Sequence, residues 1–263
     1  MSVQELFELK GQVAVVTGGT GHLGTAISEA LAEAKANVYI ASRNESKSKE
    51  LTDVLERKHG IIARGFSLDI GSMKSVKESF GRIIHDAGRV DILVNNAVYS
   101  SPIRLENASE ENWRKGIDGT INGVFRCTHA VLPVMIQRRY GSIINIASMY
   151  GVVSPDPTIY GTSGFDNPPS YGAGKAAVVQ LTRYIACHYA KLGIRANAIS
   201  PGPFPNLVVQ KNKEFISNLE KKTPMGRIGR PEELKGIVVF LASKASSYVN
   251  GANIPVDGGW TAW

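Results

Sequence analysis

Short runs of apolar residues recur along the chain, and each is followed by a longer polar or amphipathic stretch. The runs are almost continuous in Val, Ile, Leu and Ala, which is typical of strands that are covered on both faces. After the first run, Leu23, Ile27, Ala30 and Leu31 recur at helical spacing. We therefore predict strands at Val13–Thr17, Asn37–Ala41, Ile61–Leu68, Asp91–Ala97, Ser142–Ala147, Ile194–Ser200 and Ile254–Val256.

The segments between these strands predict helices. Besides the helix after the first strand, they lie at Glu45–Lys58, from the cap Ser72 to about Asp86, and over a long segment at Ser109–Arg139. Strands that alternate with helices in this way form right-handed crossovers and a parallel sheet. The sequence therefore predicts an α/β fold, a Rossmann-type doubly wound parallel sheet with helices on both faces. We expect residues 1–263 to form a single domain, because only the Pro/Gly-rich stretch 154–169 interrupts the pattern.

Composition narrows the class of protein. The chain has 43% hydrophobic and 20% charged residues, which excludes a disordered chain. Its apolar runs are far too short to span a membrane, so we expect no membrane association. The 30 basic and 23 acidic residues leave a net charge of +7. That excess fits nucleic acid, acidic lipid, an anionic cofactor, or solubility alone.

The cysteines and the N-terminal residues point to a compartment. Cys127 and Cys187 lie in apolar helical surroundings, without metal or disulfide spacing, and we predict that both are core residues. Met1–Lys10 lacks a secretory signal pattern. We expect a reducing, cytoplasmic location. No cluster of His, Cys and carboxylates has zinc-like spacing, so no metal site is predicted.

A glycine-rich turn follows the first predicted strand and opens a helix. Residues 19–24 read Gly-Thr-Gly-His-Leu-Gly, the G-x-G-x-x-G pattern. In this context the glycines permit a tight turn, close approach to a pyrophosphate and close helix packing. The helix N-terminus adds free N–H groups and partial positive charge. These features together predict a dinucleotide site.

The end of the second predicted strand indicates whether the dinucleotide is NAD(H) or NADP(H). An enzyme that prefers NAD usually has a carboxylate here for the ribose 2′-OH, whereas an Arg suits a 2′-phosphate. The sequence has Ser42 and Arg43, with no carboxylate before Glu45. We predict a preference for NADP(H), with NAD(H) as the alternative.

Tyr171 and Lys175 stand four residues apart on a helical segment. That spacing places a phenol and an ammonium on one helix face. A nearby ammonium lowers the pKa of a phenol, which normally lies near 10. The phenol can then exchange a proton with an alcohol or carbonyl oxygen as hydride is transferred.

Together these motifs resemble the short-chain dehydrogenase/reductase family over nearly the whole chain. The matching pieces, in the family's order, are Thr17–Gly24, Asp69, Asn95-Asn96-Ala97, Ser148, Tyr171 with Lys175, Pro201-Gly202, and Val256-Asp257-Gly258-Gly259. The resemblance implies that Tyr171 is the general acid/base and that Ser148 binds the substrate oxygen. It also implies that Lys175 holds the nicotinamide ribose. The cofactor would be bound by Gly18, Thr20, Gly21, His22, Leu23, Gly24, Ser42, Arg43, Asp69, Ile70, Asn95, Ala97, Tyr171, Lys175, Pro201 and Gly202.

The chain departs from the family pattern at several positions. His22 replaces a glycine usual in compact members, and it points either to solvent or towards a phosphate. Thr120 aligns with the family's assisting Asn, while Asn122 lies two residues further on. We expect a modified proton relay with catalysis retained. Val98 replaces the usual glycine after Asn95-Asn96-Ala97 and adds bulk beside the cleft.

Ser148 and Tyr171 are also further apart than is usual in the family. The extra residues lie in an insertion at about 154–169, which holds a competing Tyr160, but position 164 is Gly rather than Lys. The family's lid falls at about 203–225, with Lys211, Lys213, Lys221 and Lys222. We expect the insertion and the lid to shape the substrate pocket, although a merely solvated loop or helix face is the alternative for each.

The resemblance implies an NAD(P)(H)-dependent oxidoreductase that interconverts a secondary alcohol and a ketone. The polar insertion favours a small-molecule polyol, sugar or sugar acid. A 3-oxoacyl thioester reductase and a catalytically impaired nucleotide sensor or scaffold remain alternatives. No nucleic-acid module accompanies the charge. The family implies a homotetramer or homodimer, and Trp260 and Trp263 suit packing at an interface.

Overall fold

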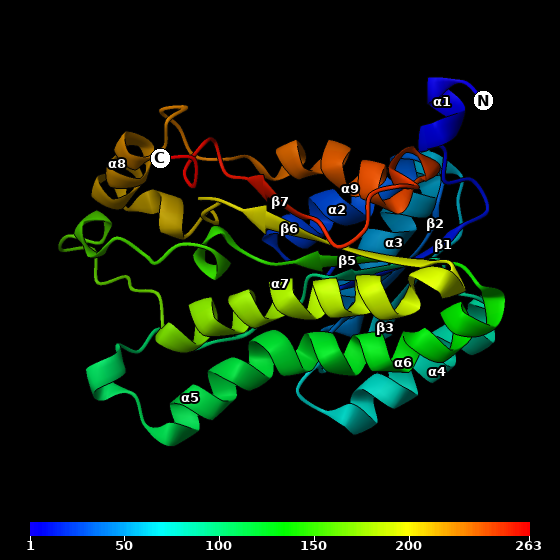
Figure 1. The fold of residues 1–263 in the computed structure, drawn as a ribbon, viewed down its shortest axis with the longest axis horizontal. Coiled ribbons are helices and arrows are strands. Elements are labelled where there is room, and N and C mark those ends of the chain that lie inside the picture. Colours follow the sequence, from blue (N-terminus) through cyan, green and yellow to red (C-terminus); the bar gives the residue numbers. More distant parts are fainter.

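A computed structural model describes residues Met1–Trp263. Its centre is a parallel sheet in the order β3-β2-β1-β4-β5-β6-β7 (Figure 1). Every predicted strand is present, with ends shifted by no more than two residues, and the predicted Rossmann-type α/β fold is confirmed. The strands are β1 (Val13–Thr17), β2 (Asn37–Ser42), β3 (Ala63–Ser67), β4 (Ile92–Asn95), β5 (Gly141–Ile146), β6 (Ile194–Pro201) and β7 (Asn253–Val256).

Helices cover both faces of the sheet. The helices of more than one turn are α2 (His22–Glu33), α3 (Glu45–His59), α4 (Met73–Ala87), α5 (Glu110–Ile117), α6 (Gly123–Arg138), α7 (Pro169–Tyr189), α8 (Lys213–Lys222) and α9 (Lys235–Ala242), and a short α1 (Val3–Phe7) precedes them. Alternate residues of β1 pack into two different hydrophobic cores, one on each face of the sheet. Ala14 and Val16 face α2, α3 and α9, whereas Val13 and Val15 face α4, α6 and α7. None of the helices is long and apolar enough to cross a membrane.

The strand order reverses at β1 and β4, which pair in parallel with Thr17 opposite Asn95. Crossovers on the two sides of this point leave in opposite directions, so a crevice opens at the carboxyl ends of the strands. The loop after β1 leads into α2, which begins at His22. The fold therefore places the predicted glycine-rich turn at the crevice.

The long helix predicted at Ser109–Arg139 is divided by a π-helical turn. Asp118–Asn122 separates α5 from α6 and carries Thr120. The Thr120 hydroxyl donates to the carbonyl of Gly116 at 2.8 Å, and the Gly119 carbonyl accepts the Tyr99 N–H at 3.2 Å. The Thr120 hydroxyl and the Tyr99 N–H, which comes from outside the helix, thus compete with regular helical hydrogen bonding at this turn. Apolar periodicity does not reveal such a change.

The prediction that both cysteines are core residues is correct for Cys127 and wrong for Cys187. Cys127 is buried, whereas Cys187 is exposed. The two residues that precede Cys187, Ile185 and Ala186, belong to the core, and a helix cannot turn three consecutive residues towards the sheet. At the C-terminal end, Trp260 is buried and Trp263 is exposed.

Candidate active site

A cleft of about 570 Å³ lies at the carboxyl ends of the central strands. It extends from Tyr171 and Lys175, past the N-terminus of α2, to Arg43 at the end of β2. The predicted site residues that it brings together are Gly18, Thr20, Gly21, His22, Leu23, Gly24, Ser42, Arg43, Asp69, Ile70, Ala97, Ser148, Tyr171, Lys175, Pro201 and Gly202. Residues distant in the sequence therefore line one elongated crevice.

The middle of the cleft suits a phosphate group. Gly21 is the N-cap of α2 and provides no side-chain cap, so the first N–H groups of the helix stay free. A Cβ at Gly24 would lie 2.1 Å from the carbonyl oxygen of Gly18, and one at Gly18 would lie 2.9 Å from the Cα of Ala97. Only glycine allows backbone segments to pack this closely. The residues present therefore fit a pyrophosphate at the helix N-terminus.

The end of the cleft beside β2 is rich in free donors. The Thr20 hydroxyl bonds to that of Ser42 at 3.2 Å. Arg43 and Lys47 are exposed, line the cleft and form no ion pair with a carboxylate. Sequence reasoning missed Lys47, although its position in the first turn of α3, four residues after Arg43, was available as a signal. Asp69 also lines the cleft and accepts the Gly71 N–H at 2.9 Å.

At the other end, Ser148, Tyr171 and Lys175 come together. The Lys175 ammonium lies 5.6 Å from the centre of the Tyr171 ring and donates to the Ile146 carbonyl at 2.5 Å. Burial lowers the pKa of Lys175 to about 8. Burial raises the pKa of Tyr171, while its hydrogen bond with Ser148 acts in the opposite direction. The phenol is thus protonated at neutral pH in the protein alone.

Two predicted site residues do not reach the cleft. Asn95 is buried behind it and donates to Thr128 at 3.1 Å and to Asn145 at 2.8 Å. Asn96, the next residue, lines the cleft instead. The alternation of side chains along an extended segment explains this one-residue difference.

Thr120 is also buried outside the cleft, where it contacts α7 at Gly174. A Cβ at Gly174 would lie 1.9 Å from the Thr120 Oγ1. The hydroxyl is hydrogen-bonded within its own helical turn and has no bond to Lys175. Whether Thr120 takes part in a relay stays a prediction.

His22 forms part of the cleft wall. Its Nε2 atom is buried without a hydrogen-bond partner. Burial lowers the pKa of His22, and the nearby Glu232 raises it. The imidazole is therefore held between the cleft and the segment that carries Glu232, instead of projecting freely into solvent.

The insertion lines a second cavity. No residue of 154–169 lines the cleft that contains Ser148 and Tyr171. The insertion borders a neighbouring space of about 740 Å³, together with Arg104 and Tyr150. Tyr160 lies on this side, stacked on Phe215 with ring centres 5.8 Å apart. The structure thus brings Tyr171, and not Tyr160, to Lys175.

The insertion is fastened to the predicted lid at 203–225. Asp156 pairs with Lys222 of α8 at 3.0 Å, and Thr162 donates to Glu214 at 3.0 Å. A small apolar core joins the two segments, with Met149, Tyr150, Ile159, Tyr160, Phe215, Leu219 and Trp260. Phe204, at the start of the lid, lines the cleft itself.

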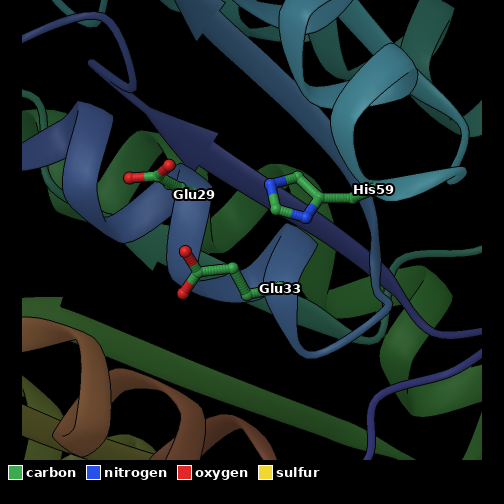
Figure 2. A group of neighbouring side chains, drawn as sticks. All are labelled: Glu29, Glu33 and His59. Atoms are coloured by element: carbon green, nitrogen blue, oxygen red, sulfur yellow. The ribbon is translucent and has the colours of Figure 1, made fainter.

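A separate group of potential metal ligands lies on α2 and α3, outside the cleft. Figure 2 shows Glu29 and Glu33 one helical turn apart, with His59 facing them. Lysine ammonium groups pair with both carboxylates: Lys58 is 2.6 Å from Glu29, and Lys235 lies 2.8 and 3.0 Å from Glu29 and Glu33. Their hydrogen bonds lower the pKa of Glu29 to about 2. This group is an ion-pair cluster that joins neighbouring helices.

Comparison with known proteins agrees with the geometry. The protein-family model described as "Enoyl-(Acyl carrier protein) reductase" matches residues 20–261. The chain is 36% identical to a galactitol 2-dehydrogenase of Rhizobium johnstonii over 100% of both chains. It is 34% identical to a 3-oxoacyl-[acyl-carrier-protein] reductase of Thermotoga maritima over 95% of this chain and 98% of the relative. A gluconate 5-dehydrogenase from Burkholderia cenocepacia, solved with NADP and tartrate, superposes with a TM-score of 0.91 at 33% identity over 100% of both chains.

Proposed function

This chain belongs to the short-chain dehydrogenase/reductase family, and on that premise we propose that it interconverts a secondary alcohol and a ketone of a polyol, sugar or sugar acid. Membership of the family makes it an NAD(P)-dependent oxidoreductase. The observation that carries the proposal is the convergence of Ser148, Tyr171 and Lys175 at one end of a cleft with a phosphate-binding turn at its middle.

A nicotinamide bound at that end would accept or supply the hydride. Tyr171 is the general acid/base, because its phenol lies in the cleft and hydrogen-bonds to Ser148. Ser148 holds the substrate oxygen at the phenol. Lys175 is buried, and its ammonium has three donors, of which the Ile146 carbonyl takes one. The remaining donors are available to the nicotinamide ribose, and the positive charge stabilises the phenolate.

We propose that the preferred cofactor is NADP(H). Arg43 and Lys47 flank the end of the cleft where a 2′-phosphate would lie, and neither has a carboxylate partner. A carboxylate placed for the ribose 2′-OH would favour NAD(H), but Ser42 occupies the end of β2. Two solved relatives, the gluconate 5-dehydrogenase from Burkholderia cenocepacia and RhlG from Pseudomonas aeruginosa, are complexes with NADP and support the binding of a nicotinamide dinucleotide.

The proposed substrate class is supported by the relatives and by the polar residues of the insertion and the lid. The galactitol 2-dehydrogenase and the gluconate 5-dehydrogenase act on polyhydroxylated compounds, as their names state. The insertion at 154–169 and the lid at 203–225 supply polar and cationic groups, including Asp166, Asn167 and Lys211. We propose that these segments shape the substrate entrance together.

A 3-oxoacyl thioester reductase is the second candidate. The relative from Thermotoga maritima favours it, as do the exposed Lys211, Lys213 and Lys221, which form no ion pairs and would attract an acidic carrier. Dependence of the rate on acyl chain length separates this candidate from the polyol enzyme.

We also propose a homo-oligomer built on α5, α6 and α7. Trp113, Phe125 and Tyr184 expose large apolar surfaces on these helices. A cytoplasmic location stays a prediction.

A substrate panel of polyols, sugar acids, ketones and 3-oxoacyl thioesters, assayed with both cofactors, tests the proposal. We expect turnover of a polyhydroxylated substrate, and its loss by roughly a hundred- to ten-thousandfold in Tyr171→Phe, with nucleotide binding retained. Tyr160→Phe is the matched control and should keep most activity. Full activity of Tyr171→Phe would overturn the mechanism. Nucleotide binding by the wild-type protein without turnover across the panel would favour a sensor.

A further inference from the structure

An aromatic residue that the motifs do not account for lies at the far end of the cleft. Tyr99 follows the Asn95-Asn96-Ala97-Val98 segment and lines the cleft beside Leu68, Asp69 and Ile70. Ser148 and Lys175 mark the hydride-transfer end, and the N-terminus of α2 marks the pyrophosphate position. The opposite end, where Tyr99 lies, is therefore where the purine nucleoside of a dinucleotide must be.

The backbone leaves room for the Tyr99 ring on two sides. A Cβ at Gly119 would come within 2.5 Å of the ring atom Cδ2 and 2.7 Å of Cγ. A Cβ at Gly71 would lie 2.8 Å from the phenol oxygen. Any larger residue at either position would displace the ring. Gly119 and Gly71 thus form a socket that fixes where the aromatic side chain lies.

Polar groups fix the orientation of the ring as well. The Tyr99 phenol donates to the carboxylate of Asp118, which also accepts from Arg126 at 2.5 Å and from Asn122 at 3.2 Å. Arg126 in turn donates to the Ile70 carbonyl at 2.9 Å, on the loop that lines the same end of the cleft. The π-helical turn supplies Asp118 and Asn122, so the irregularity in the long helix has a structural use.

The protonation states agree with this network. Burial and the bond to Asp118 raise the pKa of Tyr99 to about 12, so the phenol remains a donor. Burial raises the pKa of Asp118, but its bonds from Arg126 and Tyr99 outweigh this and leave it lowered. The carboxylate therefore stays ionised at neutral pH, and the ring is held before any nucleotide arrives.

We propose that Tyr99 is a preset aromatic wall that contacts the purine base of the cofactor, with Asp118 and Arg126 as positioning residues. The inference rests on the proposed dinucleotide function. Contact between a base and an aromatic side chain tolerates any purine because every base has a π-face. A ring that is already oriented loses little conformational freedom on binding, and this improves affinity.

Calorimetric titration with three probes tests the inference: NADPH, 2′,5′-ADP, which carries the adenosine half, and reduced nicotinamide mononucleotide, which lacks it. In Tyr99→Ala we expect affinity for NADPH and 2′,5′-ADP to fall about tenfold. The mononucleotide should bind as to wild type. Tyr99→Phe keeps the ring in its glycine socket and should stay within about threefold of wild type. Asp118→Asn weakens the bond that orients the ring, and it should lower affinity for 2′,5′-ADP by about threefold while leaving that for the mononucleotide unchanged. Tyr248→Ala, at a fully exposed tyrosine, is the matched control and should change nothing.

Two results would overturn the assignment. Unchanged binding of 2′,5′-ADP to Tyr99→Ala would show that the ring does not contact the base. An equal loss for 2′,5′-ADP and the mononucleotide, or a collapsed melting transition, would show that Tyr99 only maintains the fold. If the wild-type protein binds neither NADPH nor NADH, the proposed function fails and this inference falls with it.

Discussion

Tyr171 and Lys175 share a buried site in which each ionisation depends on the other. Burial raises the pKa of the phenol and lowers that of the ammonium to about 8. Alcohol oxidation needs the phenolate as base, and its fraction increases tenfold per pH unit below the phenol pKa. Lys175 supports the phenolate only while it is protonated. The two groups therefore predict different pH profiles for the two directions of the reaction.

We expect kcat/KM for oxidation to rise between pH 6 and 8, approaching tenfold per unit, and to flatten above about pH 8 as Lys175 loses its proton. Reduction needs the neutral phenol and should be nearly constant over the same range. Steady-state rates in both directions measure this. Lys175→Arg, which remains charged, should remove the flattening. An oxidation rate that does not change from pH 6 to 8 would contradict the assignment of Tyr171 as base.

Cofactor choice is decided by a few side chains at the end of β2. Arg43 has no ion pair, so its charge is available to a 2′-phosphate. In Arg43→Asp we expect kcat/KM with NADP(H) to fall by roughly ten- to a hundredfold, the value of a charge-assisted hydrogen bond, with little loss for NAD(H). Arg57→Asp makes the same charge change on the outer side of α3 and is the control. A wild-type enzyme that is faster with NAD(H) would refute the argument.

At the scale of elements, the apolar pattern was enough to locate every strand and most helices, because a doubly covered parallel sheet buries nearly continuous Val and Ile. The glycine motif and the four-residue spacing of Tyr171 and Lys175, rather than the apolar pattern, located the phosphate-binding turn and the catalytic end of the site. The apolar pattern missed the π-helical turn at Asp118–Asn122, because that turn depends on local hydrogen bonds rather than on hydrophobicity. It also missed Tyr99, which enters the cleft through packing against distant glycines that sequence spacing does not reveal.

The insertion and α8 act as one element, since a salt bridge and stacked rings join them. Asp156 stays ionised at assay pH, because hydrogen bonds from Thr158 and the Lys222 ammonium lower its pKa to about 2. In Asp156→Lys or Lys222→Asp we expect the insertion to be cleaved faster in limited proteolysis and the substrate KM to rise about two- to fivefold. The effect is small because exposed pairs are worth little.

The charge-swapped double variant should restore both the KM and the resistance to proteolysis. The exposed pair Lys74–Glu78 on α4 is the matched control, and its charge swap should leave KM unchanged. Single variants with wild-type KM and proteolysis would show that the insertion and the lid do not work together.

At the scale of the whole molecule, part of the net charge of +7 can be assigned to particular residues. Arg43 and Lys47 lie unpaired at the cofactor cleft, and Lys211, Lys213 and Lys221 lie unpaired on the lid. Other cations are paired within the fold, such as Lys235 with Glu29 and Glu33. Further exposed cations, such as Lys77, Arg138 and Lys191, have no ion pair and lie away from the cleft. The excess is thus shared between the cofactor cleft, the lid and ordinary surface, and it does not indicate nucleic acid.

The outer layer formed by α5, α6 and α7 predicts self-association. Phe125 and Tyr184 are 50% and 51% exposed, and each lies against a histidine one turn on, His129 and His188. Exposed aromatic anchors of this kind are typical of interfaces, and a symmetric contact buries each of them twice. We therefore expect a dimer or tetramer at micromolar concentration, measured by sedimentation velocity.

Phe125→Asp combined with Tyr184→Asp should at least halve the mass of the assembly, because each contact would then bury unpaired carboxylates. Val54→Asp introduces the same change at a 46% exposed residue on α3, on the other side of the sheet, and should leave the mass unaltered. NADPH affinity should survive in the smaller species, since the lining of the cleft comes from one chain. A wild-type protein that sediments as a monomer would contradict the proposed oligomer without affecting the assignment of the cleft.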